Sequence, residues 1–364
     1  MIIGVLTGPF FDAGYIRTLL AVGSFLLVLG LMMTSLVKQY YHAFLAQAVC
    51  IGIGAGMIFI PSIAVVSTYF DKRRSFAVGV SASGSSFGEH LPDAPPVSPI
   101  PCILINQLYP TPGGAIFPIM FHSLQPRIGF GWTTRIIGLI ALVTLGFANL
   151  VTRRRVLPTT RRKLLDVSAL REAPFMLCTA GFFFGFLGLY IPFFYITPYA
   201  LIKTRAGATL AFYFVPILNA GSIVGRLVPN ALADRIGALN VLIPCTLACG
   251  VLAFTWTAVH ENAGLIAFAI LYGFFSGAFV SLPPSTITSL SNDLSKVGTR
   301  LGMSFGICGI GVLIGSPVGG ALLNLHTGHF FHAQLFGAVV MIISCGCLML
   351  GRVAVSGSTI MIKA

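Results

Sequence analysis

Long apolar runs alternate with short polar stretches along the whole chain, and this alternation predicts membrane-spanning helices. Runs near or above 20 residues occupy 18–37, 41–69 and 128–151. The later part of the chain has six more, at roughly 173–200, 207–229, 239–259, 263–290, 301–323 and 331–353. A helix of this length crosses the bilayer core and satisfies its own backbone hydrogen bonds there. Residues 1–9 are apolar but too short to span, so we expect them to be the end of a helix that begins upstream.

One predicted helix is interrupted. An apolar segment begins at Ser75, stops at Gly88 and resumes only at 114–121. Residues 89–113 carry five prolines before Cys102 and two after it, so they cannot form a continuous helix. Joining the two apolar pieces restores a normal span with the glycine-rich pattern of 300–317. We therefore interpret 89–113 as an insertion, either a retained in-frame intron or a genuine re-entrant or extracellular loop.

Composition supports the membrane interpretation. The chain is 56% hydrophobic and 9% charged, with a mean hydropathy of +0.93 over 364 residues. The net charge of +13 comes from Lys and Arg in short loops, which is typical of cytoplasmic loops and argues against nucleic-acid binding. The eight cysteines have no metal-ligand or disulfide spacing, and the sequence has no enzyme motif. We therefore expect no cofactor, no metal and no enzymatic activity.

The basic residues also predict an orientation. If the 10–17 turn is cytoplasmic, the loops on that side and the C-terminus carry 16 of the 22 Lys and Arg, and the opposite side carries 5. By the positive-inside rule, this bias places the basic linker 152–172 and the C-terminus in the cytoplasm. We expect the linker to separate a bundle at 1–151 from a second bundle at 173–364. The lack of an organelle signal favours a multi-pass protein of the plasma membrane.

Two short turns repeat at corresponding places in the two halves. Asn230-Ala-Leu-Ala-Asp-Arg-Ile-Gly237 echoes Gly8-Pro-Phe-Phe-Asp-Ala-Gly14, which indicates a duplicated membrane protein. Together with Tyr69-Phe-Asp-Lys-Arg-Arg74 and Gly84-Ser-Ser-Phe-Gly88, these segments resemble fungal monocarboxylate-transporter-like permeases of the major facilitator superfamily. The resemblance covers nearly the whole chain except 89–113. It implies an all-α polytopic fold of two pseudo-symmetric six-helix bundles, with about eleven helices here and the first one missing.

The candidate solute-binding residues lie in the second half. Arg226 lies inside an apolar run, where an Arg normally faces a water-filled path or a partner, so we expect it to bind an anionic group of a solute. Asn219 lies seven residues earlier, on the same helix face. Tyr190, Phe194 and Tyr195 are candidates to stack on a planar solute. The alternatives are an Arg that only bonds helix carbonyls and an aromatic face that only packs.

The candidate gating residues lie in the two repeated turns. The resemblance implies that Asp12 and Arg17, and likewise Asp234 and Arg235, sit in cytoplasmic gating loops. These loops would connect the inner ends of helices by charge pairs and helix-end contacts when the path opens outward. Solvated loop charges are the alternative. Ser222 stands where monocarboxylate carriers have an Asp four residues before the Arg, which leaves proton coupling and a carboxylate substrate open.

We therefore expect a secondary transporter that moves a small organic solute, such as an organic anion or a monocarboxylate-like molecule, by alternating access. Its partners would be the solute, the lipid bilayer and, if transport is coupled, a proton. We expect a monomer. Two alternatives stay open: a carrier-like membrane sensor that does not transport, and a non-functional product of a faulty gene model.

Overall fold

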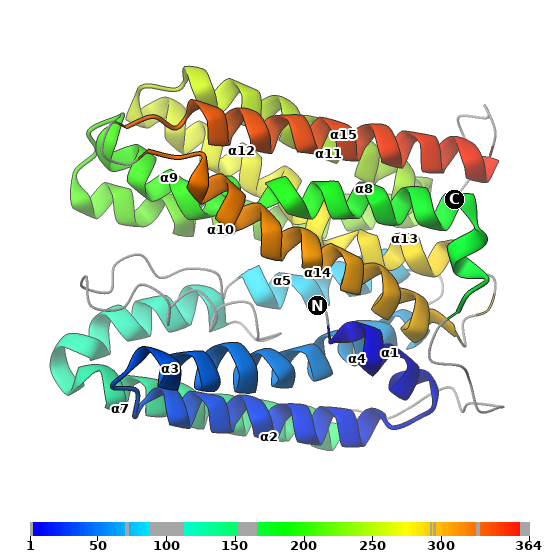
Figure 1. Ribbon diagram of the computed structural model, residues 1–364, viewed down its shortest axis with the longest axis horizontal. Coiled ribbons are helices and arrows are strands. Elements are labelled where there is room, and N and C mark those ends of the chain that lie inside the picture. The colour runs from blue at the N-terminus through cyan, green and yellow to red at the C-terminus, as the bar shows by residue number, and fades with distance from the viewer. Residues whose placement is uncertain are drawn as a thin grey trace.

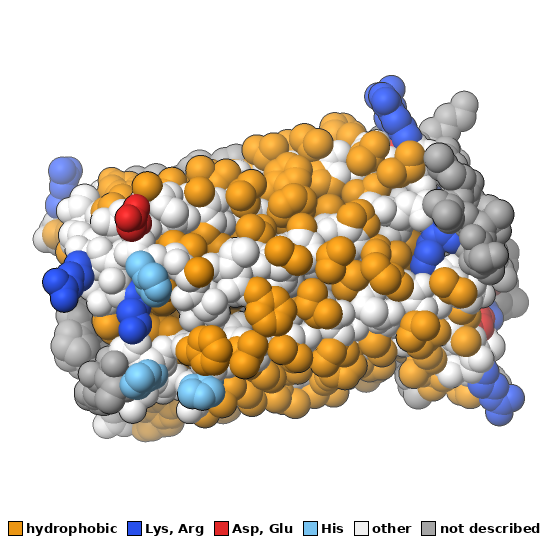
Figure 2. Space-filling view, turned by 90° about the horizontal axis from the view of Figure 1, so that it is seen from above, with side chains coloured by type: hydrophobic (Ala, Val, Ile, Leu, Met, Phe, Trp, Pro, Cys, Tyr) orange, Lys and Arg blue, Asp and Glu red, His pale blue; other side chains and the backbone are white. Residues whose placement is uncertain are grey.

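The computed structural model is helical over nearly all of the residues that it describes. These residues are 3–69, 73–86, 113–151, 166–291, 293, 296–324 and 328–356. Within these ranges, nine helices are long and apolar enough to cross a membrane. Figure 2 shows apolar side chains over the middle of the visible face and charged side chains towards both ends. The prediction of a polytopic all-α membrane protein is therefore confirmed. The insertion 89–113, apart from Gly113, and most of the linker (152–165) lie outside the described residues.

The N-terminal half follows the predicted order of spans. It contains α1 (Gly4–Asp12), α2 (Ile16–Thr34), α3 (Tyr40–Ala43), the π-helical segment η1 (Phe44–Ile51), α4 (Gly52–Tyr69), α5 (Arg74–Ser86) and α7 (Gly113–Val151). Helix α7 bends at Gly129, whose φ of 78° is in the left-handed region that glycine tolerates. This bend separates the resumed apolar segment from the predicted span at 128–151.

The C-terminal half has more breaks than the sequence predicts. It contains η2 (Ala169–Arg171), α8 (Ala173–Leu189), α9 (Ile191–Ile202), α10 (Ala208–Ile236), α11 (Ala238–Thr255), η3 (Trp256–Ala258), α12 (Asn262–Ser281), α13 (Pro283–Ser289), α14 (Val297–Ala321) and α15 (Phe331–Ser356). The predicted span 173–200 is divided at Tyr190 and the span 263–290 at Leu282. A proline lies in the first turn of each following helix, where its missing N–H costs no hydrogen bond.

The two halves lie side by side. Figure 1 shows α1 to α7, in blue to cyan, along one side of the molecule and α8 to α15, in green to red, along the other. Between the halves, α1 packs against α14 and α5 packs against α10, while α4 contacts both α14 and α13. These pairs bring segments far apart in the sequence together.

Glycines allow α10 and α12 to pack backbone to backbone. A Cβ atom on Gly225 would lie 1.8 Å from the carbonyl oxygen of Phe274, and one on Gly273 would lie 2.0 Å from that of Leu218. Small residues at such positions let membrane helices approach closely, where van der Waals packing is the main attraction. This contact holds α10, which carries Arg226 and Asp234, against α12 within the C-terminal half.

Substitution of Gly225 by Ala is expected to destabilise the fold. The new methyl group would overlap the α12 backbone, and overpacking of this kind costs about 1–3 kcal/mol. Thermal unfolding in detergent should show a lower Tm. Gly346→Ala is the matched control, because its Cβ would meet nothing within 4 Å. Equal Tm values for the two variants would contradict the close α10–α12 contact.

Candidate functional site

Asp12 reaches across to the first turn of α14 in the other half. Its Oδ1 accepts a hydrogen bond from the backbone N–H of Gly298 at 3.1 Å. Its Oδ2 accepts two more, from the backbone N–H of Thr299 at 2.7 Å and from the Thr299 hydroxyl at 2.6 Å. The first N–H groups of a helix lack intrahelical partners and carry partial positive charge, so a carboxylate is stabilised there. Asp12 therefore caps α14 from the opposite half, and we refer to these bonds as the Asp12 contact.

Asp234 makes the reciprocal arrangement, here called the Asp234 contact. It lies near the end of α10, in the C-terminal half, and accepts hydrogen bonds from the first turn of α5, in the N-terminal half. Oδ1 accepts from the backbone N–H of Ser75 at 2.8 Å, and Oδ2 accepts from that of Phe76 at 3.0 Å. The two repeated sequence segments thus form two equivalent contacts in which the halves exchange roles.

The locations of the two carboxylates differ from the prediction. Asp12 is the last residue of α1 and Asp234 lies within α10, so both belong to helices and not to the predicted loops at 10–17 and 234–237. Arg17 and Arg235 are exposed, in the first turn of α2 and the last turn of α10. The structure does not bring these two arginines into the Asp12 or Asp234 contact.

Close backbone approach accompanies each contact. A Cβ atom on Gly8 would lie 2.2 Å from the carbonyl oxygen of Gly298, and one on Gly79 would lie 2.3 Å from that of Arg226. Both pairs join opposite halves, α1 with α14 and α5 with α10. The helices can therefore meet at these points only because a side chain is absent on one of them.

Arg226 lies in the interface between the halves. Its side chain is 1% exposed, and Nη1 donates a hydrogen bond of 2.5 Å to the carbonyl oxygen of Ala82 on α5. Asn230, one turn further along α10, donates from Nδ2 to the carbonyl oxygen of Arg226 at 2.7 Å and to the Ser281 hydroxyl at 2.6 Å. Asn219 is also buried, about 10 Å before Arg226 on the same helix. This bond from Arg226 to a helix carbonyl is of the kind expected if Arg226 only bonds helix carbonyls and does not bind solute.

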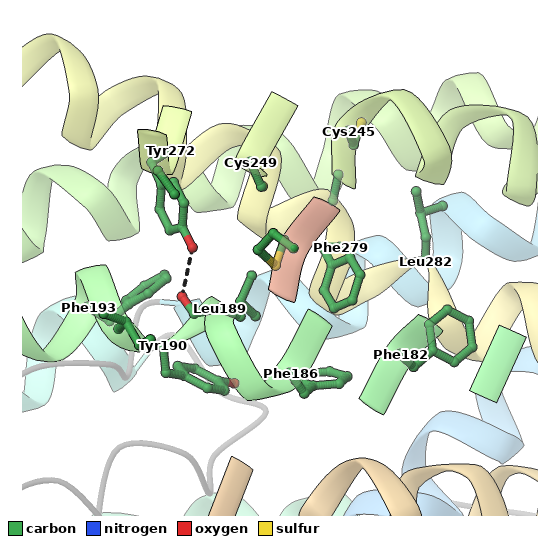
Figure 3. Packing of buried hydrophobic residues seen from close by; sticks show 14 of the residues in the cluster. Phe182, Phe186, Leu189, Tyr190, Phe193, Cys245, Cys249, Tyr272, Phe279 and Leu282 are labelled. Carbon is green, nitrogen blue, oxygen red and sulfur yellow. Dashed lines mark hydrogen bonds between the residues drawn. The ribbon is translucent and has the colours of Figure 1, made fainter. Parts of the chain in front are cut away.

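The aromatic candidates lie among other rings of the C-terminal half. Tyr190 stacks on Phe186, with ring centres 6.5 Å apart, and contacts Phe193 and Phe194 at 5.8 and 6.2 Å. Figure 3 shows Tyr190, Phe186 and Phe193 around the break between α8 and α9, beside the hydrogen bond from the Tyr272 hydroxyl to the Leu189 carbonyl. Tyr195 donates its hydroxyl to the Ser316 carbonyl on α14 at 3.2 Å.

A further aromatic contact connects the halves and was not predicted. Phe59 on α4 packs edge-on against Phe305 on α14 at 5.5 Å, and Phe305 contacts Phe186 at 6.3 Å. A series of rings therefore runs from the N-terminal half through Phe305 and Phe186 to Tyr190. Phe59 has no distinguishing sequence signal, because its span is apolar throughout.

A partly buried charge cluster was also missed. Arg300, in the first turn of α14, donates from Nε to Asp166 at 3.1 Å and from Nη1 and Nη2 to the two carboxylate oxygens of Glu172 at 2.9 and 2.6 Å. We call these three residues the Arg300 cluster. Asp166 and Glu172 are the only acidic residues of the otherwise basic linker 152–172, and that contrast was the available sequence signal.

The charge cluster makes stability depend on pH. Burial raises the pKa of Asp166, but hydrogen bonds from Ser168 and Arg300 and the positive charges of Lys296 and Arg300 outweigh burial and lower it overall. A carboxyl group with a lowered folded pKa contributes stability above its unfolded value of about 3.9, and loses that contribution as pH falls through the folded value.

Asp166→Asn is therefore expected to lower Tm at pH 7, with an effect that shrinks as pH falls through the lowered folded pKa of Asp166. The neutral amide loses the ion pair, but the protonated wild-type carboxyl has lost it as well at low pH. Thermal unfolding in detergent across this range measures the difference. Glu261→Gln, an exposed change outside the cluster, is the control. A difference between wild type and Asp166→Asn that does not shrink on acidification would contradict the pKa shift.

Comparisons with known proteins agree with the geometry. No family model matches the chain. The chain is 42% identical over 345 residues to the MFS-type transporter dbaD of Emericella nidulans, covering 94% of this chain and 72% of that protein. It is 34% identical over 357 residues to the aspyridones efflux protein apdF of the same organism, covering 98% and 67%.

A solved structure shows the same fold at low sequence identity. The human organic anion transporter MFSD10 (TETRAN) superimposes with a TM-score of 0.70 at 14% identity, covering 95% of this chain and 80% of that one. The sequence identity to fungal relatives, the shared fold and the nine apolar helices within the described ranges agree with one another. The chain belongs to the major facilitator superfamily of membrane transporters.

Proposed function

We propose that the protein transports a small organic solute by alternating access, and that the Asp12 and Asp234 contacts close one end of its path. The observation that carries this proposal is their reciprocity. Each contact joins a carboxylate of one half to the first N–H groups of a helix in the other half. Both contacts can form and break as the halves rock against each other.

The chemistry of the contacts suits a reversible closure. A carboxylate that leaves a helix N-terminus can be hydrated at the membrane surface, as can the N–H groups that it leaves. By the positive-inside rule, we assign this end and the C-terminus to the cytoplasm, so the path would open to the outside in this state. We further propose residence in the plasma membrane as a monomer.

The proposed solute has an acidic group and a planar part. The relative apdF is named for the efflux of aspyridones, which supports an organic solute, and MFSD10 is named as an organic anion transporter. Arg226 would bind the anionic group by charge-assisted hydrogen bonds, with Asn219 on the same face of α10. Tyr190, Phe194 and Tyr195 would contact the planar part. Monocarboxylate-like molecules fall within this class, and a proton is the proposed coupling ion.

Transport by purified protein in liposomes tests the proposal. Vesicles would be loaded with organic acids that differ in size and aromatic content, and efflux would be followed with and without a pH gradient. We expect saturable flux above protein-free vesicles for at least one organic anion, and a response to the gradient if a proton is coupled. Solute binding without flux would instead favour the carrier-like sensor.

A further inference from the structure

The Arg300 cluster lies directly behind the Asp12 contact. Arg300 follows Thr299, whose N–H and hydroxyl both bind Asp12. Its side chain is 8% exposed, and it connects the first turn of α14 to Asp166 and Glu172, which precede α8. Nη1 also donates to the Leu290 carbonyl, just after α13, at 3.4 Å. A single side chain thus joins the start of α14 to two other segments.

The position of Arg300 gives this connection a mechanical consequence. The first turn of a helix is its least constrained part, because its N–H groups have no partners within the helix. A bidentate Arg–carboxylate pair adds directional restraint as well as energy. With the Arg300 side chain fixed by Glu172 and Asp166, the orientation of the adjacent turn is fixed too, and so is the direction in which Gly298 and Thr299 present their N–H groups.

The equivalent contact in the other half has no arginine at the corresponding position. Asp234 binds Ser75 and Phe76, so the residue that corresponds to Arg300 is Ala77 on α5. Alanine cannot make ion pairs. The Asp12 bonds are also buried, whereas the bond from Phe76 to Asp234 is exposed. The two contacts are therefore related in geometry but unequal in support.

We propose that Arg300 is a positioning residue for closure: restrained by Asp166 and Glu172, it orients the first turn of α14 to receive Asp12. Since both acidic residues belong to the linker between the halves, the linker itself supports the stronger of the two contacts. The Asp234 contact then releases first when the end opens. This inference rests on the closing role proposed for Asp12.

The test measures separation of the halves without solute. Spin labels at Tyr15→Cys and Ile236→Cys, both exposed, would report the distance between the halves at this end in a background without native cysteines. Arg300→Gln is expected to lower the ratio of closed to open molecules by about tenfold, the value of a hydrogen bond to a charged group. Arg171→Gln removes a positive charge from the exposed surface of the same linker and should leave the ratio unchanged.

A double-mutant cycle separates positioning from general stability. If Arg300 acts through Asp12, adding Arg300→Gln to Asp12→Asn should have little further effect, while its effect should persist fully beside Asp234→Asn. Additive effects with Asp12→Asn, or an Arg300→Gln ratio equal to that of Arg171→Gln, would overturn the proposal. If Arg300→Gln does not fold, Glu172→Gln replaces it. An unchanged ratio in Asp12→Asn alone would instead refute the closing role of Asp12.

Discussion

Asp12→Asn is expected to open the closed end and to lower the transport rate by one to two orders of magnitude. Asp12 accepts three hydrogen bonds from the first turn of α14 and is 8% exposed. Asparagine has almost the same shape but no charge, and its NH₂ group faces donors rather than acceptors. Each hydrogen bond to a charged group contributes about 1.5–3 kcal/mol, so losing the charge shifts the equilibrium strongly towards the open form.

Two measurements check this expectation. The distance between spin labels on Tyr15→Cys and Ile236→Cys should increase, and efflux from liposomes should slow because one of the alternating states is depopulated. Asp234→Asn should act in the same direction but less strongly, since Asp234 accepts hydrogen bonds from the N–H groups of Ser75 and Phe76, and the second of these bonds is exposed. Wild-type distances in Asp12→Asn would show that the α1–α14 packing closes this end without the carboxylate.

Arg226→Gln is expected to reduce transport by about 10- to 100-fold while the protein still folds. Gln keeps a hydrogen-bond donor for the Ala82 carbonyl but removes the charge that would bind an anionic solute. The split between KM and kcat identifies the role. A higher KM with an unchanged label distance indicates solute binding, whereas a longer distance with an unchanged KM indicates a bond that mainly connects the halves.

Arg226→Lys is the matched variant for this residue. It retains the charge but not the planar, forked arrangement of donors, so it should restore part of the affinity for an anion. If Arg226→Gln transports every tested anion as well as wild type does, Arg226 does not contact the solute. The side chain would then be a structural contact between α10 and α5.

The helices could be predicted because membrane spans are determined largely by local composition. The predicted span 207–229 corresponds to α10, but the helix continues to Ile236 although it contains Pro229 and the polar residues that follow. A proline normally ends a helix by removing an N–H donor. Here α10 packs against α5 and α12 over this region, and tertiary packing outweighs the local preference. The π-helical segment at Phe44–Ile51 had no distinguishing sequence signal.

For the contacts of the site, the sequence indicated one partner and not the other. Asp12 and Asp234 stood out because their segments repeat, but all their partners except the Thr299 hydroxyl are backbone N–H groups, which any residue except proline provides. Arg226 stood out as a charge in an apolar run, while Ala82 did not. Arg300 and Glu172 lie 128 residues apart, and the sequence alone does not pair a basic residue at one helix end with an acidic residue before another.

Closure through main-chain donors has a genetic consequence. At Phe76, which is exposed, most side chains would leave the N–H group in place, so saturation mutagenesis should find this position tolerant, whereas proline would remove the donor outright. Asp234, by contrast, supplies its acceptor from the side chain and should tolerate almost nothing. Searches for compensating substitutions would fail for the same reason, because one member of the pair has no side chain to exchange. The contact can therefore persist through long sequence drift without leaving a co-varying pair of residues.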